Sequence, residues 1–247
     1  MTSWKNVSIP MPPIKVKNSA AAGTNPVPEA VRKARAKIRK GGKPLTRIQR
    51  EKQDIILDAA LEIFSLHGFR GATIDQIADA AGMSKPNLLY YFPSKEIIHK
   101  RLIAELLVTW LAPLREMDPD GDPIPEIRSY IRRKLEMARD YPRESRLFAN
   151  EMLQGAPRTI DMLEGDLKAL VDEKAKVLYR WMDEGKIART DPYHLIFAIW
   201  ATTQHYADFD VQVRAVLGKG RNGEGRFEDA ARFLENLFMT GLGTKRA

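Results

Sequence analysis

The sequence predicts an all-α protein, in which a three-helix domain of the helix-turn-helix type precedes a larger helical bundle. Apolar residues recur at the i, i+3, i+4, i+7 spacing of an amphipathic helix from Leu57 almost to the C-terminus. Ser, Thr or an Asp–Pro pair stands before many of these segments, and Gly or Pro follows them, as helix caps do. No stretch of the sequence shows the pattern of a strand.

Composition excludes several classes of function. The 247 residues include no cysteine, so disulfides, thiolate catalysis and thiolate metal sites are not possible. The four histidines are scattered along the chain, and we expect neither a metal site nor a cofactor. The N-terminus lacks the apolar core of a secretory signal, and the longest apolar run is too short to cross a bilayer. We therefore expect a cytoplasmic protein.

Residues 1–44 are expected to form a disordered, basic, proline-rich tail. They hold six of the fifteen prolines and few large apolar residues, with at most a transient helix at 29–40. Residues 1–52 carry thirteen Lys or Arg and two Glu, a net +11, which leaves −3 for the rest of a chain of net +8. This asymmetry suggests a polyanionic partner such as nucleic acid, although a solvated tail explains it equally well.

Residues 45–95 are expected to form the helix-turn-helix domain. The first helix ends at a glycine cap, Gly68. Thr73 begins a short second helix with the Ser/Thr-x-x-Glu/Gln pattern of a capping box, and Gly82 supplies the left-handed residue of the turn. Ser84 then caps a third helix, and Ser94 caps a longer one that continues to Pro113.

The third of these helices, Ser84–Tyr91, has the composition of a recognition helix. Lys85 and Asn87 can face bases, because Lys suits guanine and Asn suits adenine. Other polar side chains around it could meet phosphates, although one of the two tyrosines is expected to pack the domain instead. The predicted DNA contacts are Thr73, Ser84, Lys85, Asn87, Tyr90, Tyr91 and Lys95.

The segment "GFRGATIDQIADAAGMSKPNLLYYFPSK" resembles the DNA-binding domain of the TetR family of transcriptional regulators. The resemblance implies a three-helix head that binds double-stranded operator DNA, followed by an α-helical body that binds a small effector and forms a homodimer. The family usually has Gly or Ala followed by Thr where this chain has Pro86–Asn87, and commonly Tyr where it has Leu89. The operator sequence therefore does not follow from the resemblance.

Residues 96–243 are expected to be the effector-binding and dimerisation domain. Its helices are separated by Asp–Pro starts, by "GAP" and by the glycine-rich loop "GKGRNGEG". Segments of this body resemble the members of the family that sense uracil and regulate pyrimidine utilisation. The helices are expected at residues 122–140, 143–154, 160–185, 191–209 and 227–238.

The segment "FAIWATTQHYADF", residues 197–209, carries many polar groups for a core helix. At 100° per residue, Trp200 and Gln204 share one face with Asp208 beside them, while His205 and Tyr206 lie on another. The indole and the amide of the first face suit a small planar polar ligand, and the second face suits a partner subunit. The family resemblance implies uracil or thymine as the effector, with Trp110, Trp200, Gln204 and Asp208 as its contacts.

The sequence leaves other interpretations open. The polar groups of this helix could simply satisfy one another in the core, and a His205–Asp208 pair could belong to an enzyme, although no nucleophile motif accompanies it. The chain could also regulate another small-molecule pathway, or be an architectural DNA-binding protein in which the basic tail dominates. The favoured interpretation is a regulator, of the repressor type, released from its operator by uracil or thymine, and not an enzyme.

Overall fold

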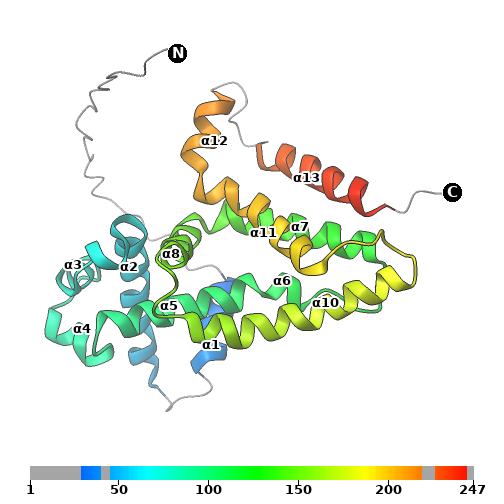
Figure 1. The fold of residues 1–247 in the computed structure, drawn as a ribbon. Helices are drawn as coiled ribbons and strands as arrows, with labels where there is room; N and C mark the ends of the chain where they lie inside the picture. The colour runs from blue at the N-terminus through cyan, green and yellow to red at the C-terminus, as the bar shows by residue number, and fades with distance from the viewer. Residues whose placement is uncertain (1–28, 40–44, 219–225, 244–247) are drawn as a thin grey trace, which may run out of the picture.

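The computed structural model describes residues 29–39, 45–218 and 226–243, and within these ranges the chain forms helices and no strand (Figure 1). The all-α prediction is therefore confirmed. In chain order the helices are α1 (Glu29–Arg39), α2 (Arg47–Gly71), α3 (Ile74–Ala80), α4 (Lys85–Tyr91), α5 (Lys95–Trp110), α6 (Ala112–Arg115), α7 (Pro123–Asp140), α8 (Pro142–Leu153), α9 (Ile160–Met162), a π-helical turn η1 (Leu163–Leu167), α10 (Lys168–Asp183), α11 (Pro192–Asp208), α12 (Asp210–Leu217) and α13 (Arg226–Leu242).

The head consists of α2, α3 and α4, and its local structure follows the predicted caps. Thr73 and Gln76 form a reciprocal capping box at the start of α3. Gly82 has φ +62° in the turn between α3 and α4, and Gly68 has φ +65°, which breaks the regular geometry of α2 at the predicted glycine cap. Ser84 is the N-cap residue of α4, although its side chain makes no capping hydrogen bond.

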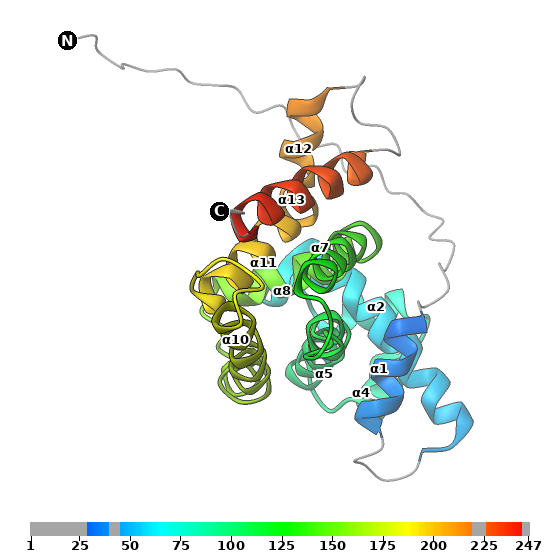
Figure 2. The ribbon, with the colours of Figure 1, turned by 90° about the vertical axis from the view of Figure 1, so that its right-hand side faces the viewer.

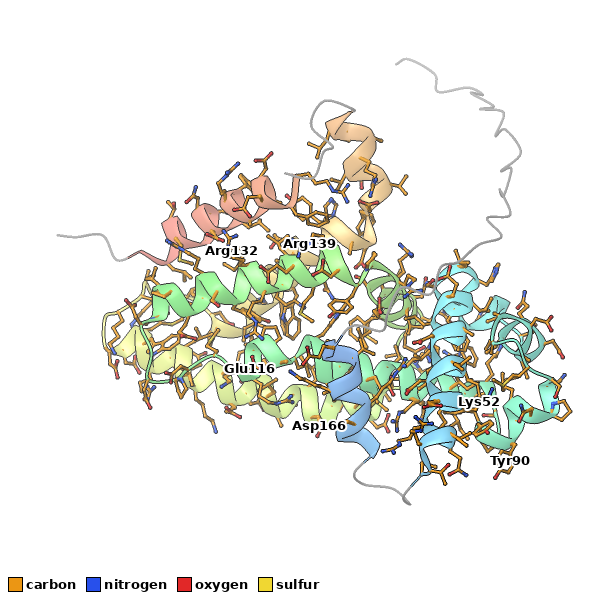
Figure 3. All side chains as sticks on the ribbon, turned by 180° about the vertical axis from the view of Figure 1, so that it is seen from behind. Lys52, Tyr90, Glu116, Arg132, Arg139 and Asp166 are labelled. Atoms are coloured by element: carbon orange, nitrogen blue, oxygen red, sulfur yellow. The ribbon has the colours of Figure 1, made fainter. Side chains whose placement is uncertain are left out.

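The body is layered, with α5 as the link to the head. α5 runs without interruption from the head into the bundle, where it lies beside α10, while α7 and α11 form the middle of the bundle (Figures 1 and 2). α13 covers α7 on the side away from α5 (Figure 2). Arg132 of α7 forms ion pairs with α13, in which its nitrogens lie 3.1 Å from Glu228 and 2.8 Å from Glu235 (Figure 3).

The structure corrects the expectation for residues 29–39, which form α1 packed against α5 instead of a disordered segment. The physical reason is Arg35, which is 3% exposed. Its guanidinium nitrogens lie 3.1 Å from Asp54, 2.7 Å from Asp58 and 3.0 Å from Glu105. Three carboxylates from α2 and α5 therefore stabilise a helix whose own sequence is strongly polar. Residues 1–28 and 40–44 of the predicted tail lie outside the described residues.

Two details of the body also differ from expectation. The predicted helix at 160–185 is divided into α9, η1 and α10, which follow one another directly. The predicted helix at 191–209 ends at Asp208, and α12 follows it after Phe209, whose φ of −113° and ψ of 28° are not helical. No signal in the sequence had predicted α12 as a separate helix.

Candidate functional site

The exposed side of α4 presents most of the predicted DNA contacts. Leu88 is fully buried and fixes the helix to the head, whereas Ser84, Lys85 and Asn87 are exposed. Tyr90 is 72% exposed, and its ring meets the ring of Tyr91 edge to face at 5.1 Å between centroids. Figure 3 shows Tyr90 at the same end of the molecule as Lys52 of α2. One side of α4 is therefore polar and exposed, and the other side is apolar and packs against the head.

The other predicted contacts are already engaged within the head. Tyr91 packs against the core, as expected of one of the two tyrosines. The Lys95 ammonium donates to the carbonyls of Phe69 at 2.8 Å and Ala72 at 2.7 Å. Thr73 accepts a hydrogen bond from the backbone N–H of Gln76 at 3.2 Å. These three residues hold the head together in this structure, and their side chains are less available to DNA than those of α4.

Lys85 is exposed, and its side chain also has a partner within the head. Its ammonium is 3.0 Å from a carboxylate oxygen of Asp75 on α3, and both side chains are at least half exposed. An exposed ion pair of this kind contributes about 0–1 kcal/mol. A base or phosphate can therefore replace Asp75 as the partner of Lys85 at small energetic cost.

The second candidate site is a cluster of polar side chains in the core of the body. Trp110 at the end of α5 is 5% exposed, and the ammonium of Lys134 on α7 stands 4.9 Å from the centroid of its ring. One turn earlier on α7, Tyr130 accepts a hydrogen bond from the indole N–H of Trp200 at 2.5 Å. α7 thus brings the two predicted tryptophans to neighbouring turns of one helix.

Asp208 closes the cluster from the C-terminal end of α11. Its carboxylate accepts a short hydrogen bond from the hydroxyl of Ser145 on α8. Burial raises the pKa of Asp208, while the hydrogen bond from Ser145 and the charge of Lys134 oppose that rise. Burial likewise lowers the pKa of Lys134 to about 8, against the attraction of Asp208. Each of these two groups therefore titrates under the influence of the other.

The remaining polar groups of α11 differ in burial. Thr203 is fully buried, and its hydroxyl donates to the carbonyl of Ile199 at 2.7 Å, so it satisfies itself within the helix. Gln204 is half-buried one turn after Trp200. His205 is exposed, and its ring stacks on Phe209 with centroids 5.1 Å apart. His205 thus lies at the surface.

Sequence reasoning missed three members of the cluster: Tyr130, Lys134 and Ser145. A signal for Lys134 was present, because it falls in the stripe of α7 that also carries Ile127, Ile131 and Leu135, all of which are buried. A lysine at such a position interrupts an otherwise apolar face. No comparable signal marks Ser145, whose partner lies 63 residues away.

Both α5 and α8 run from this cluster toward the head. Beyond Ser145, α8 carries Glu151, which is 1% exposed and binds Arg158 at 2.8 Å. The Arg158 guanidinium in turn lies 3.5 Å from the ring centroid of Phe69, near the end of α2. His99 of α5 is buried beside Phe69, and burial lowers its pKa to about 4. A continuous set of contacts therefore joins the body cluster to the head.

A third feature is an exposed apolar surface on α11, α12 and α13. Its large exposed side chains are Phe197, Phe209, Val211, Val216, Phe233 and Leu237. An open hollow of about 450 Å³ lies between these helices, with Tyr206, Val213 and Phe233 among its lining residues. Exposed apolar side chains gathered around a hollow are typical of protein interfaces.

Within the described ranges, no group of three His, Asp or Glu side chains could hold a metal ion. The same ranges contain no helix that combines the length and the hydropathy needed to span a bilayer.

Two family models match the chain. The model of bacterial regulatory proteins of the tetR family matches residues 56–102, and that of the C-terminal region of YcdC-like proteins matches residues 103–245. The chain is 50% identical over 191 residues to the HTH-type transcriptional regulator RutR of Escherichia coli (strain K12), the pyrimidine-utilisation regulator. That alignment covers 77% of this chain and 90% of RutR.

Solved structures share the fold at low sequence identity. The ketosteroid transcriptional regulator KstR2 of Mycobacterium tuberculosis superposes with a TM-score of 0.63 at 20% identity, covering 83% of this chain and 98% of KstR2. AibR, in complex with isovaleryl coenzyme A and operator DNA, superposes with a TM-score of 0.59 at 16% identity, covering 75% and 97%. A head with a helical body is thus the shared architecture.

Proposed function

The chain belongs to the TetR family of transcriptional regulators, and on that basis we propose that it represses genes of pyrimidine metabolism and leaves its operator when it binds uracil or thymine. The observation that carries the effector part of the proposal is the polar cluster of the buried Trp110 with the half-buried Trp200 and Asp208. Its place in the core, linked to the head by two helices, suits an effector site. A regulator of this kind acts on chromosomal DNA, so its expected location is the cytoplasm.

Recognition of a pyrimidine ring is assigned to the four predicted residues. The indole of Trp200 offers a flat surface for the ring, Trp110 closes the site beside it, and the amide of Gln204 offers a donor and an acceptor for the alternating C=O and N–H groups of the ligand. Asp208 supplies a further acceptor. Uracil has about eight heavy atoms, so micromolar binding at about −8 kcal/mol requires about −1 kcal/mol per atom. Only a site that encloses the ring almost fully provides this, which favours a position in the core of the bundle.

Recognition of DNA is assigned to the exposed side of α4 in the major groove. Asn87 and Lys85 read bases, and Ser84 and Tyr90 contact phosphates. The contacts within the head of three other predicted residues, Thr73, Tyr91 and Lys95, support this surface. Their proposed phosphate contacts lie at the edge of the surface formed by α4. Because Pro86–Asn87 departs from the family pattern, the operator sequence does not follow from the family.

The active unit is proposed to be a homodimer, as is typical of TetR regulators. The exposed apolar surface of α11, α12 and α13 offers the contact between subunits, because a symmetric dimer buries the same patch on both copies. Two heads then meet two half-sites that lie one or a few helical turns apart on the duplex. To move operator occupancy from nearly full to nearly empty, the effector must favour the released state by about 5.5 kcal/mol.

A gel-shift experiment tests the proposal. Fragments from promoters of pyrimidine-catabolic genes are incubated with the protein, with uracil, thymine, a purine or no addition. We expect a shifted band that disappears with uracil or thymine and persists with the purine. The variant Gln204→Ala is expected to shift the same fragments and to respond weakly to uracil. A shift that no pyrimidine affects would contradict the proposed effector, and absence of any shift would contradict the proposed regulon.

A further inference from the structure

Lys134 makes no hydrogen bond or ion pair with the described residues, and the contact of its ammonium is with the ring of Trp110. Its residue is 5% exposed on the apolar stripe of α7, and the nearest ring, that of Trp110, is 4.9 Å from Nζ to centroid. Within the described ranges no carboxylate forms an ion pair with it, although the charge of Asp208 acts on it from a longer distance. A buried charge without a close partner destabilises a fold. A residue that the fold does not need is a candidate for binding.

One buried neighbour of Lys134 lacks a hydrogen-bond partner among the described residues, and a second neighbour is a half-buried carboxylate. The indole N–H of Trp110 is buried and finds no acceptor in the described part of the chain. The carboxylate of Asp208 receives the Ser145 hydroxyl on one oxygen, Oδ1, and its pKa is raised by burial. Lys134 therefore links the two, since its ammonium stands over the Trp110 ring and interacts with the charge of Asp208. Buried polar groups in native proteins almost always have partners, so the unpaired indole N–H of Trp110 calls for a ligand that supplies an acceptor.

We propose that Lys134 is an effector-binding residue that donates to a carbonyl oxygen of the ligand while Asp208 accepts the neighbouring N–H. The site thereby selects neutral cyclic amides that carry an O=C–N–H edge. Trp110 Nε1 is the second donor to the carbonyl side. The proposal rests on the proposed function in its location, because it assigns ligand chemistry to the same cluster, but it does not require the ligand to be uracil.

The charges of the two residues support a neutral ligand. The positive charge of Lys134 and the negative charge of Asp208 balance each other. A neutral amide therefore gives each group a hydrogen-bond partner without adding charge to the core. A ligand carboxylate would place a second negative charge near Asp208, and like charges in a buried site repel strongly. A ring whose nitrogens are methylated keeps its carbonyls but has no N–H to offer Asp208, which is then left without its partner.

Isothermal titration of the full chain with a matched set of rings tests the inference. The ligands are uracil, glutarimide and 2-pyridone, which carry the edge, and 1,3-dimethyluracil and uracil-6-carboxylate, which lack the N–H or add a charge. We expect the first group to bind and the second to bind much more weakly. In Lys134→Met, binding of the first group is expected to weaken by roughly tenfold to a hundredfold, as for loss of a hydrogen bond from a charged donor. Lys134→Gln keeps an N–H donor and should regain part of the affinity.

The matched control is Lys174→Met. Lys174 is also buried, but its ammonium donates to the carbonyl of Met117 at 3.2 Å, in the contact of α10 with the segment after α6. Its replacement should leave ligand affinity unchanged, which separates loss of a contact from general loss of packing. Thermal unfolding of each variant confirms that the titrated protein is folded.

The outcomes separate this inference from the proposed function. If Lys134→Met binds uracil within about threefold of the unaltered protein, the inference is overturned and the proposed function stands. If the unaltered protein binds glutarimide or 2-pyridone through Lys134 but not uracil, the pyrimidine effector is wrong and the inference stands. Tight binding of 1,3-dimethyluracil or of the carboxylate overturns the inference. If none of the cyclic amides binds, both proposals fail.

Discussion

Replacing Lys134 by methionine is expected to stabilise this protein, in contrast to most core substitutions. Methionine has a similar length and volume, so it fills the same space without a cavity. Burial lowers the pKa of Lys134 from 10.5 to about 8. Each pKa unit corresponds to about 1.4 kcal/mol, so the buried ammonium destabilises the fold by about 3 kcal/mol at neutral pH. Lys134→Met should raise the free energy of unfolding by up to about that amount.

The pH dependence gives the prediction its sign. A lysine whose pKa is lower in the folded state than in the unfolded state binds fewer protons when folded, so stability increases as pH rises between the two values. The destabilisation is therefore complete below pH 8 and disappears as pH approaches 10.5. The advantage of Lys134→Met over the unaltered protein should be largest at pH 7 and small at pH 10.5. Groups that titrate in both proteins cancel in this difference.

Urea unfolding, followed by tryptophan fluorescence and circular dichroism at pH 7, 9 and 10.5, measures this difference. The control Lys174→Met should lose stability at pH 7, because the carbonyl of Met117 loses its donor. The reasoning is refuted if Lys134→Met is less stable than the unaltered protein at pH 7, or if a gain in stability persists undiminished at pH 10.5. Either result would mean that the ammonium is not destabilised by burial.

Three further predictions address the other features. Arg35→Ala should lower the free energy of unfolding by about 3 kcal/mol in urea, since it removes the buried cation shared by Asp54, Asp58 and Glu105. The exposed Lys33→Ala should change it little. Asn87→Ala should reduce preference for operator over unrelated DNA by about 1–3 kcal/mol in competition gel shifts while general DNA affinity stays the same; equal loss on both DNAs would contradict a base contact. Arg158→Ala removes both the contact with Phe69 and the ion pair with Glu151, so uracil should bind as before but release less operator in fluorescence anisotropy. Full release would exclude this route of coupling.

The sequence was a good guide wherever structure depends on neighbours in the chain. Capping patterns such as Thr73–Gln76 and the Asp–Pro starts of α7 and α11 set helix bounds to within a residue or two, because a cap acts on the first turn beside it. α1 could not be predicted in the same way. Its stability depends on carboxylates 19 to 70 residues away in the sequence, and its own composition is typical of a solvated segment.

The candidate site shows the same division. Trp200, Gln204 and Asp208 share one helix, so their spacing alone indicated a common face. Tyr130 and Ser145 bind members of that face from other helices, 70 and 63 residues away, and no local pattern links them to it. Long-range contacts of this kind are set by the packing of whole helices, which a single sequence does not specify.

The position of the cluster offers a reason for keeping a destabilising lysine in the core. α5 carries Trp110 at one end and begins at Lys95 in the head, about 22 Å away at 1.5 Å per residue. α8 carries Ser145 in the cluster and Glu151 near the head, where Arg158 reaches Phe69. A ligand that satisfies the donors and the acceptor of the cluster draws α5, α7, α8 and α11 toward one geometry. A ligand shifts an equilibrium only by the difference in its affinity for the two states. A charge that is unsatisfied before binding increases that difference, and so increases the free energy available for the conformational change. An apolar residue at position 134 would give a more stable protein with less free energy available to move the head.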